Sequence, residues 1–220
     1  MFTWIHSVLT RAPSTVPIVV LMRHAAREPM ATGLPDADLP LTEQGRQSAH
    51  ALGGRLAPHL HSIRSSPIRR CRETASELLA GAGLALECPS DTLLGDPGVF
   101  IRDAVQAWPT FTTYSMSELI DALLVPGRRL PGMEEGEVAV TRLLNHLFAL
   151  SRGSRGLHLA ITHDYLVTVT ALQVLGLTPH PSRYADFLEP LALWYHDQHL
   201  WGYYQASCQR CEVEGLSITP

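Results

Sequence analysis

The sequence contains no lysine, and all 17 of its basic side chains are arginines. This absence excludes Walker-A nucleotide binding, Schiff-base chemistry and any kinase that needs a strand lysine. Cysteine is also scarce, because four residues in 220 are too few for a disulfide framework at this length. We therefore expect a reducing, cytoplasmic setting and a chemistry that relies on Arg, His, Asp, Glu, Ser or Cys.

Long apolar runs and a strong charge imbalance are missing as well. No run approaches the length that spans a bilayer, and the first residues lack the basic and apolar regions of a signal peptide. The formal net charge of −4 argues against a broad surface for nucleic acid or anionic membranes. With 45% hydrophobic residues, we expect one globular domain over residues 1–220. We expect it to bind neither nucleic acid nor membranes. Its oligomeric state is left open.

Short aliphatic runs alternate with helical patterns along the chain. Strands are expected at 17–22, 60–64, 84–88 and 157–162, with a hairpin of 191–195 and 200–204. One helix is expected to begin at a Thr42 N-cap and to end at Leu56. A second is expected from Ser66 and Pro67, as N-cap and N1, to about Ala80. Further helices are expected over 116–124, 134–152 and 165–177. Residues 89–132 look like an irregular, cap-like insertion over one sheet edge. This order predicts an α/β three-layer sandwich with a mixed, mostly parallel sheet.

Polar clusters follow three of the expected strands directly. They span residues 23–27 with Arg23, His24 and Arg27, residues 65–70 with Ser66 and Arg70, and residues 162–164 with His163 and Asp164. In open α/β sheets, ligands bind outside the carboxyl ends of the strands. The clusters therefore predict one binding site that all three strands share.

The residue types in these clusters suit a phosphate or carboxylate ligand. Arginine forks make bidentate, charge-assisted hydrogen bonds to such anions. A helix that begins at Ser66 would add backbone N–H groups and the positive end of its dipole. A neutral imidazole can attack phosphorus, while Asp164 could protonate the leaving oxygen.

Taken together, the motifs resemble those of the histidine phosphatase superfamily, which includes cofactor-dependent phosphoglycerate mutases and histidine acid phosphatases. Residues 23–29 are similar to its motif Arg-His-Gly-x-Arg-x-Pro, except that Ala25 replaces glycine. Residues 41–45 resemble its Leu-Thr-x-x-Gly helix start, and 66–75 its Ser-x-x-x-Arg-x-x-x-Thr-Ala segment. Residues 162–164 resemble the second-histidine motif. The resemblance runs in order from about residue 17 to residue 177.

The resemblance implies a phosphoglycerate mutase-like fold and hydrolysis of a small phosphorylated substrate through a phosphohistidine. His24 would carry the phosphoryl group, Arg23, Arg70 and His163 would cradle it, and Arg27 would assist. No metal or cofactor is implied. The missing glycine requires that Ala25 keep a negative φ.

Several alternatives stay open at this point. The proton donor is Asp164 in the acid-phosphatase pattern, whereas the mutase-like pattern points to Asp96. A phosphomutase or phosphotransferase, or a non-catalytic phospholigand-binding protein, would carry the same residues. Arg102, Arg128 and Arg129 either hold a second anionic group of the substrate or lie on the surface. Cys208 and Cys211 have metal-ligand spacing but no second Cys or His pair.

Overall fold

A six-stranded mixed sheet forms the centre of the molecule, in the strand order β2-β3-β1-β4-β5-β6. The computed structural model describes residues 2–29, 36–95, 97–212 and 216–218. The described strands are β1 (Pro17–Arg23), β2 (Leu60–Ser65), β3 (Gly156–Thr162), β4 (Pro190–His196), β5 (His199–Tyr204) and β6 (Ser207–Arg210). Strands β2, β3 and β1 pair in parallel, and the remaining pairs are antiparallel. The sheet is therefore mixed, as predicted, but three of these five pairings are antiparallel, so it is not mostly parallel.

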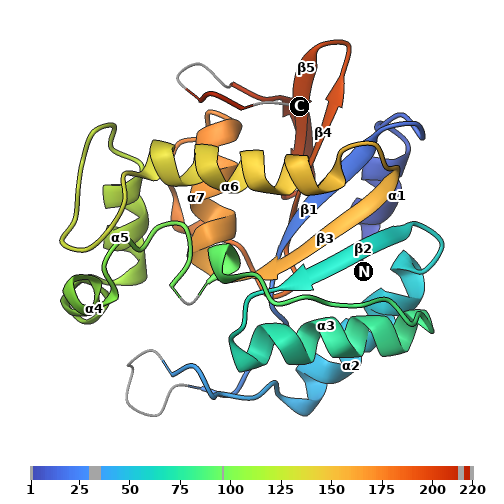
Figure 1. Ribbon diagram of the computed structural model, residues 1–220, viewed down its shortest axis with the longest axis horizontal. Helices are drawn as coiled ribbons and strands as arrows, with labels where there is room; N and C mark the ends of the chain where they lie inside the picture. Colours follow the sequence, from blue (N-terminus) through green and yellow to red (C-terminus); the bar gives the residue numbers. More distant parts are fainter. Residues whose placement is uncertain (1, 30–35, 96, 213–215, 219–220) are drawn as a thin grey trace.

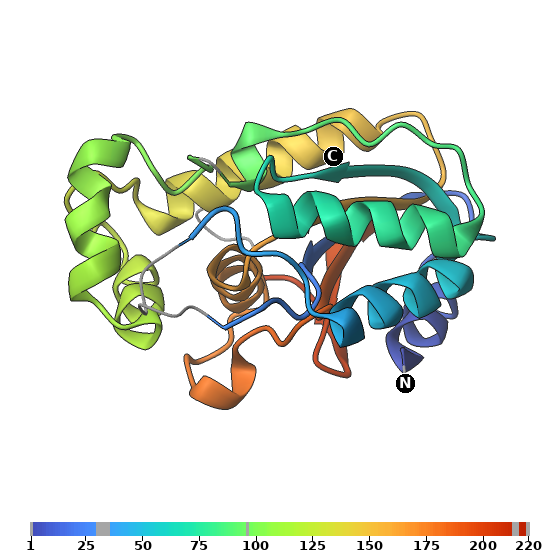
Figure 2. The ribbon, with the colours of Figure 1, turned by 90° about the horizontal axis from the view of Figure 1, so that it is seen from below.

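Helices cover both faces of the sheet and give the expected three layers (Figures 1 and 2). On one face lie α1 (Thr3–Leu9), α2 (Glu43–Leu56) and α3 (Arg69–Ala82), and on the other α6 (Gly136–Ser151) and α7 (Asp164–Val174). Successive side chains of β1 point to opposite faces of the sheet and so contribute to two hydrophobic cores. Val20 and Met22 pack in the core under α1–α3, whereas Val19 and Leu21 pack in the core under α6 and α7. Within the described ranges, no helix has the length and hydropathy needed to cross a bilayer.

The segment that the sequence marks as an irregular insertion contains two α-helices. Helix α5 (Met116–Leu123) is confirmed, whereas α4 (Ala104–Thr113) is not predicted because Pro109 lies inside it. The Asp103 side chain accepts hydrogen bonds from the backbone N–H groups of Val105 and Gln106, which fixes the start of α4 despite the proline. Figure 1 shows α4 and α5 together at one end of the molecule, beyond the sheet.

The structure corrects two predicted elements and adds two that the sequence did not predict. Helix α3 begins at Arg69, not at Ser66 and Pro67, because the backbone of Ile68 is still extended (φ −64°, ψ 136°) and Ile68 is the N-cap residue. Residues 84–88 form no strand, since only Ser90 makes an isolated bridge to the sheet, at Ser65. Helix α1 and strand β6 have no counterpart in the predicted elements.

Helix α2 begins where the sequence predicts, with Thr42 as its N-cap. The Thr42 side chain accepts a hydrogen bond from the Gly45 N–H at 3.0 Å. A Cβ atom on Gly45 would lie 2.1 Å from the carbonyl oxygen of Ala26. The glycine therefore lets α2 approach the loop that follows β1, the loop that carries the first polar cluster.

Two glycines of α2 give a matched test of this contact. We expect Gly45→Ala to lower the free energy of unfolding by about 1–3 kcal/mol, because backbone must move to admit the methyl group. Gly54, whose Cβ would meet its nearest neighbour at 3.4 Å, is exposed in the same helix. Gly54→Ala should raise stability by about 0.5–1 kcal/mol through helix propensity. Urea denaturation measures both, and equal effects would contradict the contact.

Candidate active site

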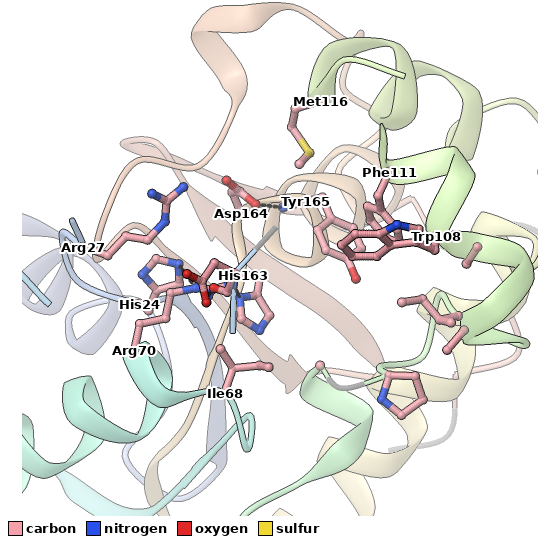
Figure 3. A pocket seen from close by; sticks show the side chains of 16 residues that line it. His24, Arg27, Ile68, Arg70, Trp108, Phe111, Met116, His163, Asp164 and Tyr165 are labelled. Atoms are coloured by element: carbon pink, nitrogen blue, oxygen red, sulfur yellow. Dashed lines mark hydrogen bonds between the residues drawn. The ribbon is translucent and has the colours of Figure 1, made fainter. Parts of the chain in front are cut away.

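The three polar clusters meet at one edge of the sheet. In the parallel register, Arg23 lies beside Thr162 and Ser65 lies beside Ile161, so β1, β3 and β2 end side by side. The residues that follow these strand ends line one side of a cavity of about 300 Å³. Figure 3 shows His24, Arg70, His163 and Asp164 around it. The predicted convergence of these four residues is what the structure shows.

His24 is held in a single tautomer by the backbone. Its Nδ1 lies 2.8 Å from the carbonyl oxygen of Ala25, which can only accept, so Nδ1 carries the proton. Nε2 is therefore unprotonated, and it accepts a hydrogen bond from Arg70 Nε at 3.0 Å. Ala25 has no positive φ, as its methyl group requires, and its N–H donates to Thr74 Oγ1 at 3.0 Å.

His163 faces the same guanidinium from the other side. Its Nδ1 accepts from Arg70 Nη2 at 3.2 Å, so its Nε2–H donates to Ser66 Oγ at 3.1 Å. The two imidazole rings meet edge to face with centroids 5.7 Å apart. A Cβ atom on Gly95 would lie 2.6 Å from His163 Nε2, so the space beside this ring requires a glycine. Ser66 therefore positions His163 and does not open a helix.

Arg23 sits behind this pair and does not line the cavity. Its guanidinium forms an ion pair with Asp164 at 3.1 Å, donates to the Ala185 carbonyl at 2.7 Å, and stacks 4.1 Å above the ring of Phe187. Its Nε is buried and has no hydrogen-bond partner among the described residues. One donor of this buried cation is thus still available beside His24.

The other candidates are placed less centrally. Arg27 lines the cavity and donates to the carbonyl of Glu28 at 2.8 Å. Asp96 lies outside the described residues. None of Arg102, Arg128 and Arg129 lines the cavity, and Arg129 pairs with Glu135.

Cys208 and Cys211 do not form a metal site. Cys208 packs on the core under α1–α3, whereas Cys211 is buried in the core under α6 and α7. The two thiols therefore lie on opposite faces of the sheet. No cluster of His, Cys, Asp and Glu suited to a metal ion occurs in the described part of the chain.

Comparisons with known proteins identify the fold of the chain. The model of the histidine phosphatase superfamily (branch 1) matches residues 19–93. A phosphoglycerate mutase from Bacillus anthracis superimposes with a TM-score of 0.60 at 19% identity, over 88% of this chain and 94% of that chain. A mycobacterial glucosyl-3-phosphoglycerate phosphatase gives 0.56 at 21% identity, over 82% and 91%. The protein histidine phosphatase SixA, bound to tungstate, gives 0.52 at 16%, over 88% and 93%. No curated protein matches the sequence.

The chain has a histidine phosphatase fold. The predicted resemblance to the superfamily is thereby confirmed, and the matched segment contains the first two polar clusters.

In this histidine phosphatase fold, several supporting residues are missing from the sequence prediction. Phe187 lies under Arg23 and 5.7 Å from the His24 ring, but it follows no strand and belongs to no motif. Thr74 and Glu73 belong to the motif of residues 66–75, but the spacing of a motif does not reveal which atoms its residues contact. The Glu73 carboxylate accepts from the Leu41 N–H at 2.8 Å and so ties α3 to the start of α2.

Burial is the main cause of the low pKa of both histidines. Burial, followed by the charges of Arg70 and Arg23, lowers the pKa of His163 to about 3. The pKa of His24 also lies well below its usual value, first through burial and then through His163 and the nearby arginines. Both imidazoles are therefore neutral near pH 7. The phosphatase fold thus presents an unprotonated Nε2 at the bottom of a cationic pocket.

The buried state of His163 predicts acid sensitivity. Its folded pKa of about 3 lies below the ordinary 6.5, so the unfolded chain binds this proton more tightly. The corresponding stability is fully present above about pH 6.5 and is lost as the pH falls toward 3, at up to about 1.4 kcal/mol per pH unit. His163→Gln retains a donor and an acceptor but does not titrate. Urea denaturation at decreasing pH should therefore give a shallower slope for this variant, and an unchanged slope would contradict the assignment.

Proposed function

We propose that this chain is a phosphomonoester hydrolase that acts on a small phosphorylated substrate through a phosphohistidine at His24. The observation that carries the proposal is the unprotonated His24 Nε2, which faces Arg70 at the cavity while Nδ1–H is fixed on the Ala25 carbonyl. This is the protonation state and orientation that a nucleophilic imidazole needs.

Phosphate binding must replace one hydrogen bond between Arg70 and His24. Arg70 Nε now donates to the same Nε2 lone pair that would attack phosphorus. A phosphoryl oxygen between the rings is a stronger, anionic acceptor for the Arg70 N–H groups. The free Nε–H of Arg23 and the cavity-lining Arg27 offer further donors nearby. Binding thus frees the nucleophile and neutralises charge on the transferring group.

In the first step, His24 Nε2 bonds to phosphorus and the bond to the leaving oxygen breaks. The imidazole ring becomes cationic, and the Ala25 carbonyl 2.8 Å from Nδ1 stabilises that charge. The Asp164 carboxylate, at the cavity wall beside Arg23, takes up the proton of the bound phosphomonoester monoanion and passes it to the leaving alcohol.

In the second step, water attacks the phosphohistidine. The Asp164 carboxylate takes the proton of the water, inorganic phosphate leaves, and His24 returns to its neutral form. The arginines remain charged throughout and serve only to hold the phosphoryl oxygens.

Removing the nucleophile tests the proposal most simply. His24→Ala should lower kcat/KM on p-nitrophenyl phosphate by roughly 10⁴-fold or more, because the phosphohistidine intermediate forms on His24 itself. Rapid quench with labelled substrate should trap a phosphoprotein in the wild type whose label is lost in acid and kept in alkali. The variant should trap none. His6→Ala, on an exposed side chain of α1, is the control and should behave as the wild type. Full activity of His24→Ala would refute the mechanism.

The proton donor is tested by comparing leaving groups. Asp164→Asn should lower the rate on an alkyl phosphate by about 10²–10⁴-fold, and much less on p-nitrophenyl phosphate, whose leaving group needs no proton. Asp96→Asn should affect the two substrates equally. The reverse pattern would assign the proton to Asp96, the donor of the mutase-like pattern.

Product analysis separates hydrolysis from transfer. We expect inorganic phosphate as the main product even with excess acceptor alcohol. A phosphorylated acceptor in place of phosphate would identify a mutase or phosphotransferase. Phosphate binding without turnover on a broad panel of phosphomonoesters would identify a non-catalytic phospholigand-binding protein.

A further inference from the structure

The cavity has two chemically different ends. Its ionisable side chains, including His24, Arg70 and His163, gather where the strands finish. The opposite wall comes from α4, α5 and the segment before them, and Figure 3 shows Trp108, Phe111 and Met116 there, across the cavity from the histidines. The apolar residues of this wall are Ile101, Ala104, Ala107, Trp108, Phe111 and Met116. One end therefore fits an anion, whereas the other has no charged side chain among the described residues.

Two large side chains of this wall are unusually exposed. Trp108 is 50% exposed and Met116 is 40% exposed, although both are apolar and both face the cavity. Exposed apolar side chains that gather in one concave place mark a surface that a ligand covers. Phe111 supports the wall from behind, because its ring packs edge to face on Tyr165 with centroids 5.9 Å apart. The wall is thus built on a packed layer of aromatic rings.

Besides Arg70, the cavity has one arginine that could pair with an anionic group, Arg27, and the proposed function assigns it to the phosphate. All 17 arginines fall within the described ranges, and only Arg27 and Arg70 line the cavity. Arg70 is already engaged at the phosphate end, where it bridges the two histidines. Among the described residues, the other charged side chains that line the cavity, Asp36 and Asp164, are acidic and would repel a carboxylate. A substrate with two anionic ends would therefore have an unpaired charge.

On these observations, and resting on the proposed function, we propose that the preferred substrates are phosphomonoesters of apolar alcohols or phenols. The apolar group lies against Trp108, Phe111 and Met116 while the phosphate lies at His24. The cavity volume of about 300 Å³ is at the lower end of the range for ligand pockets, which limits the group to a ring or a short alkyl chain.

An n-alkyl phosphate series measures this preference, because the chemistry of the leaving oxygen stays nearly constant from ethyl to hexyl phosphate. We expect kcat/KM to rise by about two- to fourfold per added methylene, since a fully buried methylene contributes at most about fourfold. Trp108→Ala and Met116→Gln should each reduce the hexyl-to-ethyl ratio. Val105→Ala changes an 84% exposed side chain of α4 that does not line the cavity, and should keep the wild-type ratio.

Binding of non-hydrolysable phosphonates separates this inference from the proposed activity. Calorimetry should show that hexylphosphonate binds more tightly than butylphosphonate, and that butylphosphonate binds more tightly than 3-phosphonopropionate, which ends in a carboxylate. If no ester is hydrolysed but this order of affinities holds, the hydrolase proposal fails and the inference about the cavity stands. A flat alkyl series, a preference for the carboxylate, or a ratio that Val105→Ala lowers as much as Trp108→Ala would overturn the inference.

Discussion

The guanidinium of Arg70 lies between two buried neutral imidazoles, and the geometry of the site depends on these contacts. Its Nε donates to His24 Nε2 at 3.0 Å and its Nη2 to His163 Nδ1 at 3.2 Å. Both rings must therefore carry their protons on the far nitrogens, where the Ala25 carbonyl and Ser66 Oγ accept them. Burial beside this cation lowers the pKa of both histidines, so one arrangement of hydrogen bonds fixes charge, tautomer and orientation together.

The fold supports this contact through helix α3. Arg70 lies in the first turn of α3, and the next residues of the same helix hold the neighbouring loops. Thr74 accepts the Ala25 N–H, and Glu73 accepts the Leu41 N–H ahead of α2. Strands β1, β2 and β3 are parallel, so their ends bring both histidines to this one helix. The apolar wall from α4 and α5 then closes the far side of the cavity. In the proposed substrate, an apolar group and not a second anionic group lies against this wall.

Sequence reasoning recovers the features that depend on local patterns. Buried strands and the polar residues after them follow from hydrophobic runs, and parallel pairing then implies that His24 and His163 meet. The Thr42 cap is likewise a local signal. Features set by distant contacts are missed: helix α4 forms around Pro109 because of its cap and its packing, and Phe187 reaches Arg23 from a segment with no motif. The helix start expected at Ser66 is wrong for the same reason, because the Ser66 Oγ accepts from the distant His163 Nε2–H and the backbone stays extended up to Ile68.

The central claim is that a phosphoryl group sits between the two histidines, in line with His24 Nε2. A crystal structure with bound vanadate, which adopts the geometry of the transferring phosphoryl group, tests it most directly. We expect vanadium bonded to His24 Nε2, with its oxygens on Arg70, His163 and the Nε of Arg23. Vanadate bound elsewhere in the cavity, or held with the Arg70–His24 hydrogen bond intact, would contradict it.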